Sequence, residues 1–411
     1  MTPGIASKIG RNLHLKPGHP LNIIKNRIAY YFEQRAQQAE AEAKKSGAVT
    51  SEAYRFKLVD DVSPIVTAQQ NFDDLLVPPT HPGRSPSDTF YYTREKLLRT
   101  HTSAHQREYL RSGLTNFLVV GDCYRRDEID ASHYPVFHQM EGVRIFPHDM
   151  ARFNRGADGT DLVVQDLKST LDGLVRYLFG PDIEVRWIDA YFPFTHPSFE
   201  MEILFQGKWL EVFGCGVIQH AIMDAACAQP NMKGQINGWA FGLGLERLAM
   251  VLFDIPDIRL FWSEDARFLD QFTKVKEDLY ASNGKFNKIT FAPFSKYPAC
   301  FKDVAFWVPP EDAPSSSTSA SSSSPSPSTS SAPSVRFHEN DFCSLVRDIA
   351  GDIVENVTLI DSFTHPKTKQ VSKCYRIMYR SLDRTLTNEE IDVLQEQVRQ
   401  QIGSKLGLKL R

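Results

Sequence analysis

The chain has 411 residues, of which 42% are hydrophobic. This length is greater than that of an ordinary domain with one hydrophobic core, so we predict two domains. Its formal net charge of −3 at pH 7 gives no support for general nucleic-acid affinity, because such proteins usually carry a basic excess. Six cysteines without a CxxC pair argue against a zinc knuckle or a secreted disulfide framework. We find no secretory signal and no apolar run of membrane-spanning length, so we expect a soluble protein.

The N-terminal segment is basic and then helical. Residues 1–32 contain Lys and Arg but no Asp or Glu, a bias found in organelle transit peptides. After Pro20, Leu21, Ile24 and Ile28 recur at helical spacing, and the pattern continues to near Gly47. We therefore expect this helix to belong to the mature fold and any presequence to have been removed.

Short strands alternate with a few helices in the middle of the chain. Strand patterns occupy residues 117–125, 137–146, 184–192, 198–205 and 208–217. Such spacing is typical of a mostly antiparallel sheet flanked by helices. We predict an α+β domain over residues 1–290.

The first two of these strands are joined by a loop rich in ionisable residues. Alternate residues of a strand share a face, so Phe137, Gln139 and Glu141 project together and His138 projects the other way. A ring, an amide and a carboxylate on one face suit the floor of a small-molecule site. Glu141 would hold an ammonium group, and Arg125 a phosphate or carboxylate. In the alternative interpretation these charges pair with one another across a solvated hairpin, and the spacing alone leaves both open.

A second motif lies at residues 238–253, which read as a strand, a glycine-rich turn and a helix. Gly242 and Gly244 would let the backbone approach a ligand closely. Arg247 falls in the first turn, where a bound anion would offset its unfavourable position in the helix dipole. Alternatively, the glycines serve only packing and Arg247 extends into solvent. Taken together, the two motifs place two arginines around a polyphosphate.

The C-terminal part predicts a second domain over residues 291–411. Residues 313–334 are nearly all Ser, Pro, Thr and Ala and should form a disordered loop. The flanking patterns follow the order βαββαβ, a ferredoxin-like unit with both helices on one sheet face. Thr387 and Glu390 predict a capping box for the last helix, and Gly403 predicts its end.

Two pairs of histidines raise the question of a metal. His101 and His105 stand four apart on an expected helix, but the segment lacks the glutamate of a zinc protease motif. His133 and His138 are expected to face different ways. We therefore predict no zinc site.

Five segments carry a resemblance to a known family. YRRDEIDASHYPVFHQMEG at residues 124–142 resembles motif 2 of class II aminoacyl-tRNA synthetases, and GLGLER at residues 242–247 resembles motif 3. LLRTHTSAHQ at residues 97–106, FPFTHPSFE at residues 192–200 and the ferredoxin-like C-terminus are similar to phenylalanyl-tRNA synthetases, in their single-chain organellar form.

This resemblance implies an activity, partners and a location. It implies activation of L-phenylalanine with ATP and Mg²⁺ to an aminoacyl-adenylate, followed by transfer to tRNA(Phe) in mitochondrial translation. A monomer in the mitochondrial matrix, with no membrane partner, is expected. Residues 1–290 would form the class II catalytic domain and residues 291–411 the anticodon-binding domain.

The resemblance also implies roles for individual residues. The catalytic pair would be Arg125, on the α-phosphate, and Arg247, on the γ-phosphate. The expected ATP-binding residues are Arg125, Asp127, His133, Phe137, Glu211, Gly244 and Arg247, with Glu211 also holding Mg²⁺ and Asp127 standing where the family usually has glutamate. The expected phenylalanine-binding residues are His101, Ser103, Gln106, Gln139, Glu141, Phe192, Phe194 and Ala240. The expected tRNA-binding residues are Lys373, Arg376, Arg380, Lys405 and Lys409.

Three of these positions bear on specificity. Phe192 and Phe194 would grip the substrate phenyl ring edge to face, and Ala240 would keep the pocket end small. Such a pocket rejects an added hydroxyl only about 10²-fold, so slow activation of tyrosine is expected, and no segment remains for an editing domain. In the C-terminal domain Tyr375, Tyr379 or Phe363 would stack on an unpaired base.

Two rival functions remain. One is a synthetase-like RNA-binding protein without catalysis, which the presence of both Arg125 and Arg247 disfavours. The other is a class II ligase for a different amino acid, which FPFTHP at residues 192–197 and Ala240 disfavour.

Overall fold

The computed structural model describes residues 2–46, 55–146, 157–226, 236–273, 289–293, 297–308 and 337–411. The chain divides into two compact units. Met1–Arg125 and Tyr134–Phe294 form the N-terminal unit, and Arg126–His133 and Ser295–Arg411 form the C-terminal unit. Within the described residues, no helix is both long enough and apolar enough to cross a membrane.

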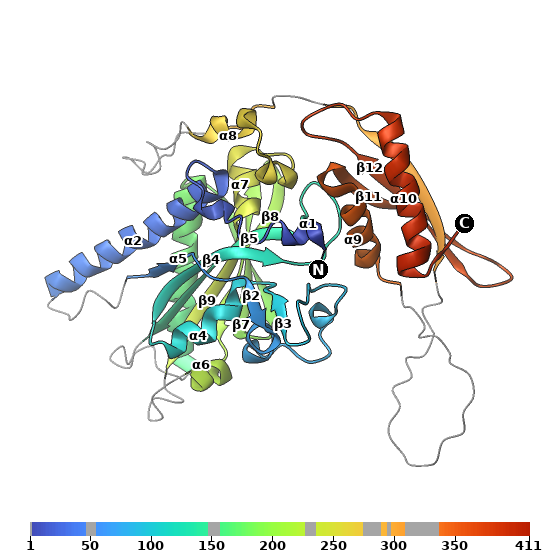
Figure 1. Ribbon diagram of the computed structural model, residues 1–411. Coiled ribbons are helices and arrows are strands. Elements are labelled where there is room, and N and C mark those ends of the chain that lie inside the picture. The colour runs from blue at the N-terminus through green and yellow to red at the C-terminus, as the bar shows by residue number, and fades with distance from the viewer. Residues whose placement is uncertain are drawn as a thin grey trace, which may run out of the picture. The chain divides into compact units, whose positions relative to one another are not determined.

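A seven-stranded sheet organises the N-terminal unit (Figure 1). Its strands, in spatial order, are β1 (Lys57–Val59), β4 (Asn116–Tyr124), β5 (Val136–Phe146), β9 (Asn237–Gly244), β8 (Lys208–Ile218), β7 (Thr195–Phe205) and β6 (Val185–Phe192). All neighbouring strands are antiparallel except β1 and β4. The mostly antiparallel α+β fold expected from the strand spacing is confirmed.

Three helices cover one face of this sheet, which we call the back face. They are α2 (Pro20–Ser46), α5 (Ala157–Phe179) and α7 (Leu245–Phe253). Phe32 of α2 stacks on Phe241 with ring centroids 5.8 Å apart, and the Trp239 indole donates to Asp166 of α5 at 2.7 Å. The helix predicted after Pro20 is therefore confirmed, and it is part of the hydrophobic core.

The opposite face, which we call the ligand face, is bordered by shorter elements. These are the two-stranded sheet of β2 (Ile65–Thr67) and β3 (Lys96–Leu98), the 3₁₀ helix η5 (Thr102–His105), and the helices α3 (Ala68–Asn71), α4 (Gln106–Arg111) and α6 (His220–Ala226). They bury an apolar cluster that includes Leu97, Val143 and Ala240. The other α-helices in the described part of this unit are α1 (Pro3–Ala6) and α8 (Ala266–Thr273), and its short 3₁₀ helices include η8 (Ile258–Trp262).

The described part of the C-terminal unit forms a four-stranded antiparallel sheet with two α-helices (Figure 1). Its elements in chain order are β10 (Cys300–Val308), α9 (Glu339–Ala350), β11 (Val354–Thr364), β12 (Val371–Tyr379), α10 (Asn388–Leu406) and β13 (Lys409–Leu410). The spatial order β11-β12-β10-β13 is that of a ferredoxin-like fold, as predicted. Phe306 and Ile377 lie beneath Phe342 and Val398 of the helices, which leaves the other sheet face uncovered.

Two sequence predictions about helices were wrong. The capping box of Thr387 and Glu390 is present, but α10 continues past Gly403 to Leu406. It ends there because Gly407 adopts the left-handed conformation (φ +65°) that stops a helix. His101 is extended and lies before η5, so His101 and His105 do not share a helix.

Two further expectations concern the C-terminal unit. Tyr375 and Tyr379 are 0% exposed and belong to its core, so neither is available to stack on a base. Their alternation with Arg376 and Met378 placed them on the helix-covered side of β12. The Ser-rich segment 313–334 lies outside the described residues.

Candidate functional site

Rows of paired residues build the floor of the site on the ligand face. Gln139 of β5 pairs with Gly244 of β9, and Glu141 pairs with Gly242, which in turn pairs with Gly214 of β8. Residues paired across antiparallel strands project to the same face. An amide and a carboxyl group therefore stand beside a strip of glycine backbone.

The glycines differ in the space above them. A Cβ atom at Gly244 would meet nothing within 4 Å, whereas one at Gly242 would lie 2.9 Å from Gln139 Nε2. A Cβ at Gly214 would lie 2.9 Å from Phe192 Cζ, so the Phe192 ring rests on the bare backbone. The floor is thus open at Gly244 and closed by side chains at the other two positions.

Glu141 is a buried ionisable group of this face. Its exposed fraction is 2%, and its Oε2 atom has no hydrogen-bond partner among the described residues. Burial raises the pKa of this carboxyl to about 8, against the opposing hydrogen bond from Ser103. A buried acid with an unsatisfied oxygen is suited to an ammonium ligand, which would stabilise its charged form.

The segment from His101 to Gln106 borders this carboxyl group. The backbone N–H of Thr102 donates to Gln139 Oε1 at 3.1 Å. Gln106 Oε1 and His101 Nδ1 are both buried without a partner among the described residues. Burial, followed by the charge of Arg125, lowers the pKa of His101 to about 3, so this ring is neutral.

Arg125 and Arg247 lie at the same end of the sheet. Strands β4 and β9 are both antiparallel to β5, so they run in the same direction and their C-terminal ends meet one edge. Arg125 directly follows β4, donates from Nε to the Thr100 carbonyl at 2.8 Å, and lies 5.1 Å from the centroid of the Phe137 ring. Arg247 is in the first turn of α7 after β9.

Glu211 of β8 lies beside Arg247. Arg247 Nη1 is 3.4 Å from Glu211 Oε2 and 3.3 Å from the Glu211 carbonyl oxygen. The side chains are 57% and 48% exposed, so this ion pair is weak and both groups remain available to a ligand.

The sequence reasoning missed Glu200, which pairs with Gly214 on the same face. Burial, followed by the charges of Glu211 and Glu202, raises the pKa of Glu200. Its alternation with Glu202 in the strand pattern was the available signal.

An apolar lobe lies beyond the glycine strip. The rings of Phe192 and Phe194 stack with centroids 5.8 Å apart and an interplanar angle of 15°. Ala240 pairs with Gly216, and Phe194 packs against the cluster that contains Ala240. A small residue at Ala240 and two parallel rings therefore border one end of the floor, in agreement with a flat apolar substrate group.

Two expected nucleotide contacts are not part of this sheet. Asp127 and His133 lie in segment 126–133, which belongs to the C-terminal unit. The hydrogen bond between His133 Nδ1 and Asp130 Oδ2, 2.7 Å long, and the Asp130 charge outweigh burial and raise the pKa of His133. Their predicted contacts with ATP stay predictions.

Segment 126–133 also contains a group of side chains, found among the described residues, whose ligand atoms are close enough together to hold a metal ion. Glu128, Asp130 and His133 each offer one ligand atom, and these atoms lie within 4.8 Å of one another. Glu211, the residue expected to hold Mg²⁺, does not belong to such a group. A Mg²⁺ ion at Glu211 would therefore take most of its ligands from phosphates and water, which is its usual mode of binding.

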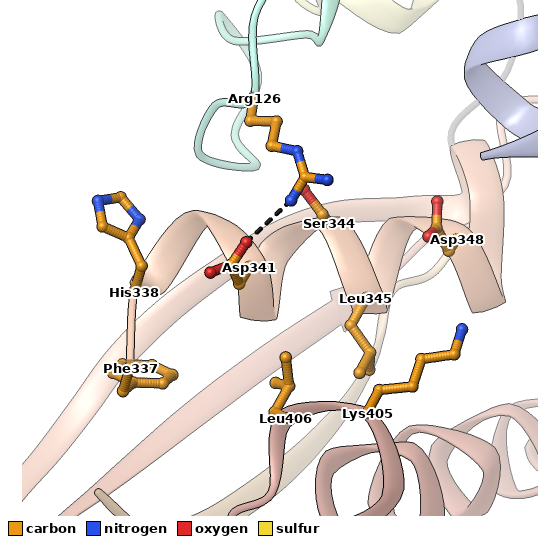
Figure 2. A pocket seen from close by; sticks show the side chains of 9 residues that line it. All are labelled: Arg126, Phe337, His338, Asp341, Ser344, Leu345, Asp348, Lys405 and Leu406. Atoms are coloured by element: carbon orange, nitrogen blue, oxygen red, sulfur yellow. Dashed lines mark hydrogen bonds and ion pairs between the residues drawn. The ribbon is translucent and has the colours of Figure 1, made fainter. Parts of the chain in front are cut away.

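A pocket of about 280 Å³ lies in the C-terminal unit (Figure 2). It is lined by Arg126, Phe337, His338, Asp341, Ser344, Leu345, Asp348, Lys405 and Leu406. Figure 2 shows the Arg126 guanidinium directed at Asp341, with Nη1 to Oδ1 at 2.8 Å. Its wall contains two acidic side chains, Asp341 and Asp348, beside Arg126 and Lys405, so the pocket has no strong preference for an anion.

The basic residues expected to bind tRNA lie on different sides of the C-terminal unit. Arg376 pairs with Asp303 at 2.8 Å and Arg380 with Glu355 at 3.2 Å. Lys373 reaches to 5.4 Å from the Phe337 ring on the helix-covered side. Lys405 lines the pocket, whereas Lys409 pairs with Trp307 on the uncovered face. Their roles toward tRNA stay predictions.

These features agree with the comparisons to known proteins, from which we conclude that the chain belongs to the class II aminoacyl-tRNA synthetases. Residues 49–272 match the family model of the tRNA synthetases class II core domain (F), and residues 295–411 match the ferredoxin-fold anticodon binding domain. The resemblance predicted from five sequence segments is confirmed.

Relatives resemble the chain over its whole length. It is 45% identical to the mitochondrial phenylalanine–tRNA ligase of Dictyostelium discoideum, over 100% of this chain and 89% of the relative. It is 47% identical to the chloroplastic/mitochondrial phenylalanine–tRNA ligase of Arabidopsis thaliana, over 99% and 81%. For the mitochondrial phenylalanine–tRNA ligase of Mus musculus the identity is 45%, over 100% and 85%.

Proposed function

We propose that this chain is a phenylalanine–tRNA ligase that activates L-phenylalanine with ATP and transfers it to tRNA(Phe) through an aminoacyl-adenylate. The observation that carries the proposal is Glu141, a buried carboxyl group with an unpartnered oxygen on a floor that ends at Phe192 and Phe194. An ammonium group and a phenyl ring are the two ends of phenylalanine that these features fit.

The chain's own residues account for the first step. The phenylalanine carboxylate attacks the α-phosphorus of ATP and pyrophosphate leaves, so negative charge gathers on the phosphoryl oxygens. Arg125 stabilises that charge on the α-phosphate and Arg247 on the γ-phosphate. Glu141 and Gln139 orient the substrate ammonium, and Phe137 stacks on adenine. The enzyme supplies position and charge, and no protein nucleophile is required.

A divalent cation fits one place at this edge. Glu211 is a half-exposed carboxylate beside Arg247, and it is paired in register with Glu202 of β7. Bound Mg²⁺ would neutralise charge on the nucleotide phosphates. Glu211 would hold the ion and help to place Arg247.

The second step and the setting of the enzyme follow from the same proposal. A ribose hydroxyl of the tRNA end attacks the adenylate carbonyl and releases AMP, while residues 291–411 bind the anticodon region. The catalytic domain would span residues 1–290. The relatives' names support a mitochondrial location, and we place the enzyme in the matrix as a monomer.

Exchange of pyrophosphate into ATP tests this proposal directly. With a panel of amino acids and folded protein, phenylalanine should support rapid exchange and tyrosine exchange about 10²-fold slower. If another amino acid supports the fastest exchange, that amino acid is the substrate and the assignment of phenylalanine is wrong. Absence of exchange with every amino acid would refute a ligase function and favour a non-catalytic RNA-binding protein.

A further inference from the structure

On the back face of the sheet, the buried carboxylate of Glu246 connects the two sequence motifs of the site, residues 124–142 and 242–247. Glu246 is the second residue of α7 and is 3% exposed. Its Oε2 accepts the backbone N–H of His138 at 2.7 Å, and its Oε1 lies 2.7 Å from His138 Nδ1. His138 is 0% exposed and belongs to β5. One side chain thus holds the first turn of a helix against a strand.

This contact continues the sheet where strand pairing stops. The β5–β9 ladder ends at Gln139 and Gly244, and the next N–H of β5, that of His138, is taken by the Glu246 carboxylate. The N-cap residue Gly244 provides no side-chain hydrogen bond to α7, and the Glu246 carboxylate ties the first turn of the helix to β5. Because Nδ1 faces a carboxylate, it carries the proton and donates.

Three residues of the proposed site depend on the same carboxylate. Phe137 and Gln139 flank His138 on β5 and project to the ligand face, while Arg247 directly follows Glu246 on α7. Fixing Glu246 to His138 therefore fixes the distance between the nucleotide arginine and the two β5 side chains. Misplacement of such groups by about 1 Å lowers a reaction rate by about 10²-fold.

We propose that Glu246 is a positioning residue, which acts through His138 to hold Arg247 in register with Phe137 and Gln139. This inference rests on the proposed function. Glu246 touches no substrate; its carboxylate lies on the back face, under the strand whose opposite side forms the floor. Its removal should therefore change the use of ATP more than the binding of phenylalanine.

The kinetic test compares three variants in phenylalanine-dependent pyrophosphate exchange. Glu246→Ala should lower kcat/KM for ATP by about 10²-fold and change KM for phenylalanine by less than about threefold. Glu246→Gln should retain most of the activity, since its amide oxygen still accepts the His138 N–H. Asp166→Asn, which removes a carboxylate bound to Arg144 at the other end of β5, is the control and should leave the exchange unchanged.

A double-mutant cycle separates positioning from general destabilisation. If Glu246 acts through Arg247, adding Glu246→Ala to Arg247→Lys should cost little beyond Arg247→Lys alone. Additive losses, or equal losses for ATP and phenylalanine, would overturn the inference. Should Glu246→Ala fail to fold in a thermal scan, the same cycle with Glu246→Asp decides, because the shorter carboxylate cannot keep both contacts with His138. An inactive wild type would instead count against the proposed function, so the two failures are distinguishable.

Discussion

In the ligand-free protein, the charged form of the Glu141 carboxyl group destabilises the fold. Its pKa is raised from 4.5 to about 8, so the folded protein binds its proton more tightly than the unfolded chain does. The contribution of this group to the stability of the ligand-free fold is therefore largest below pH 4.5, and it is lost as the pH rises from 4.5 to about 8. An ammonium ligand removes the penalty because it stabilises the carboxylate.

Phenylalanine binding should therefore release a proton from Glu141. At pH 7, below the raised pKa, the empty site is mostly protonated, and the incoming ammonium favours ionisation. Affinity should rise from pH 6 to pH 8 and then level. Calorimetry in two buffers of different ionisation enthalpy measures the release. Glu141→Gln should bind about 10–10²-fold more weakly without proton release; equal release in the variant would assign the proton elsewhere.

Arg247→Ala should lower adenylate formation by about 10²–10³-fold, because it removes a fixed positive charge from the developing phosphoryl charge. Rapid-quench measurement of phenylalanyl-adenylate in a single turnover tests this. Arg267→Ala removes an exposed arginine paired with Asp265 and is the control. A similar loss in both variants would mean that Arg247 has no special role.

At the scale of the elements, strand and helix patterns were readable because local periodicity reports burial. Alternation in residues 137–146 assigned Glu141 and His138 to opposite faces, as observed. The C-terminal end of α10 could not be predicted, because the sequence does not show which of Gly403 and Gly407 adopts the left-handed conformation that ends the helix. The bond between Glu246 and His138 joins residues 108 apart in sequence, and no local pattern reports such a contact.

The glycine strip of β9 offers a matched pair of substitutions. Gly244 has φ −86°, which alanine adopts freely, and its Cβ would enter open space on the ligand face. Gly244→Ala should fold with unchanged melting temperature but raise KM for ATP about tenfold. Gly242→Ala would displace Gln139 and should raise KM for phenylalanine instead. Exchange kinetics with each substrate varied separately, together with thermal melts, distinguish the two; identical kinetic defects would contradict this geometry.

At the scale of the whole molecule, the chain folds as two compact units. Composition and βαββαβ order predicted the second unit, because each element shows its own periodicity. The pocket that includes Arg126, Asp341 and Lys405 was not predictable, since three distant segments form its wall. Likewise, net charge could not locate a tRNA surface, because Arg376 and Arg380 are already paired with acids.

The uncovered face of the C-terminal sheet should contribute to tRNA charging but not to adenylate formation. It presents Phe363, whose ring lies 4.9 Å from the Arg411 guanidinium, and Lys409 beside Trp307. Loss of one base-stacking ring costs about 1–3 kcal/mol. Phe363→Ala and Lys409→Ala should raise KM for tRNA about tenfold and leave pyrophosphate exchange unchanged. Val393→Ala, an exposed truncation on α10, is the control; unchanged aminoacylation in both variants would exclude this face.

A substrate ring bordered by a side chain that rests on bare main chain meets a rigid surface, because the peptide planes behind that side chain cannot change rotamer. The Phe192 ring resting on Gly214 leaves that wall no room to move inward. A pocket that selects its substrate by size and shape alone accepts analogues of nearly equal size, whatever their electronic character. Para-fluorophenylalanine should therefore be charged within about tenfold of phenylalanine in an aminoacylation assay. Organellar proteins made with this enzyme could then carry fluorine labels for NMR without any redesign of the ligase.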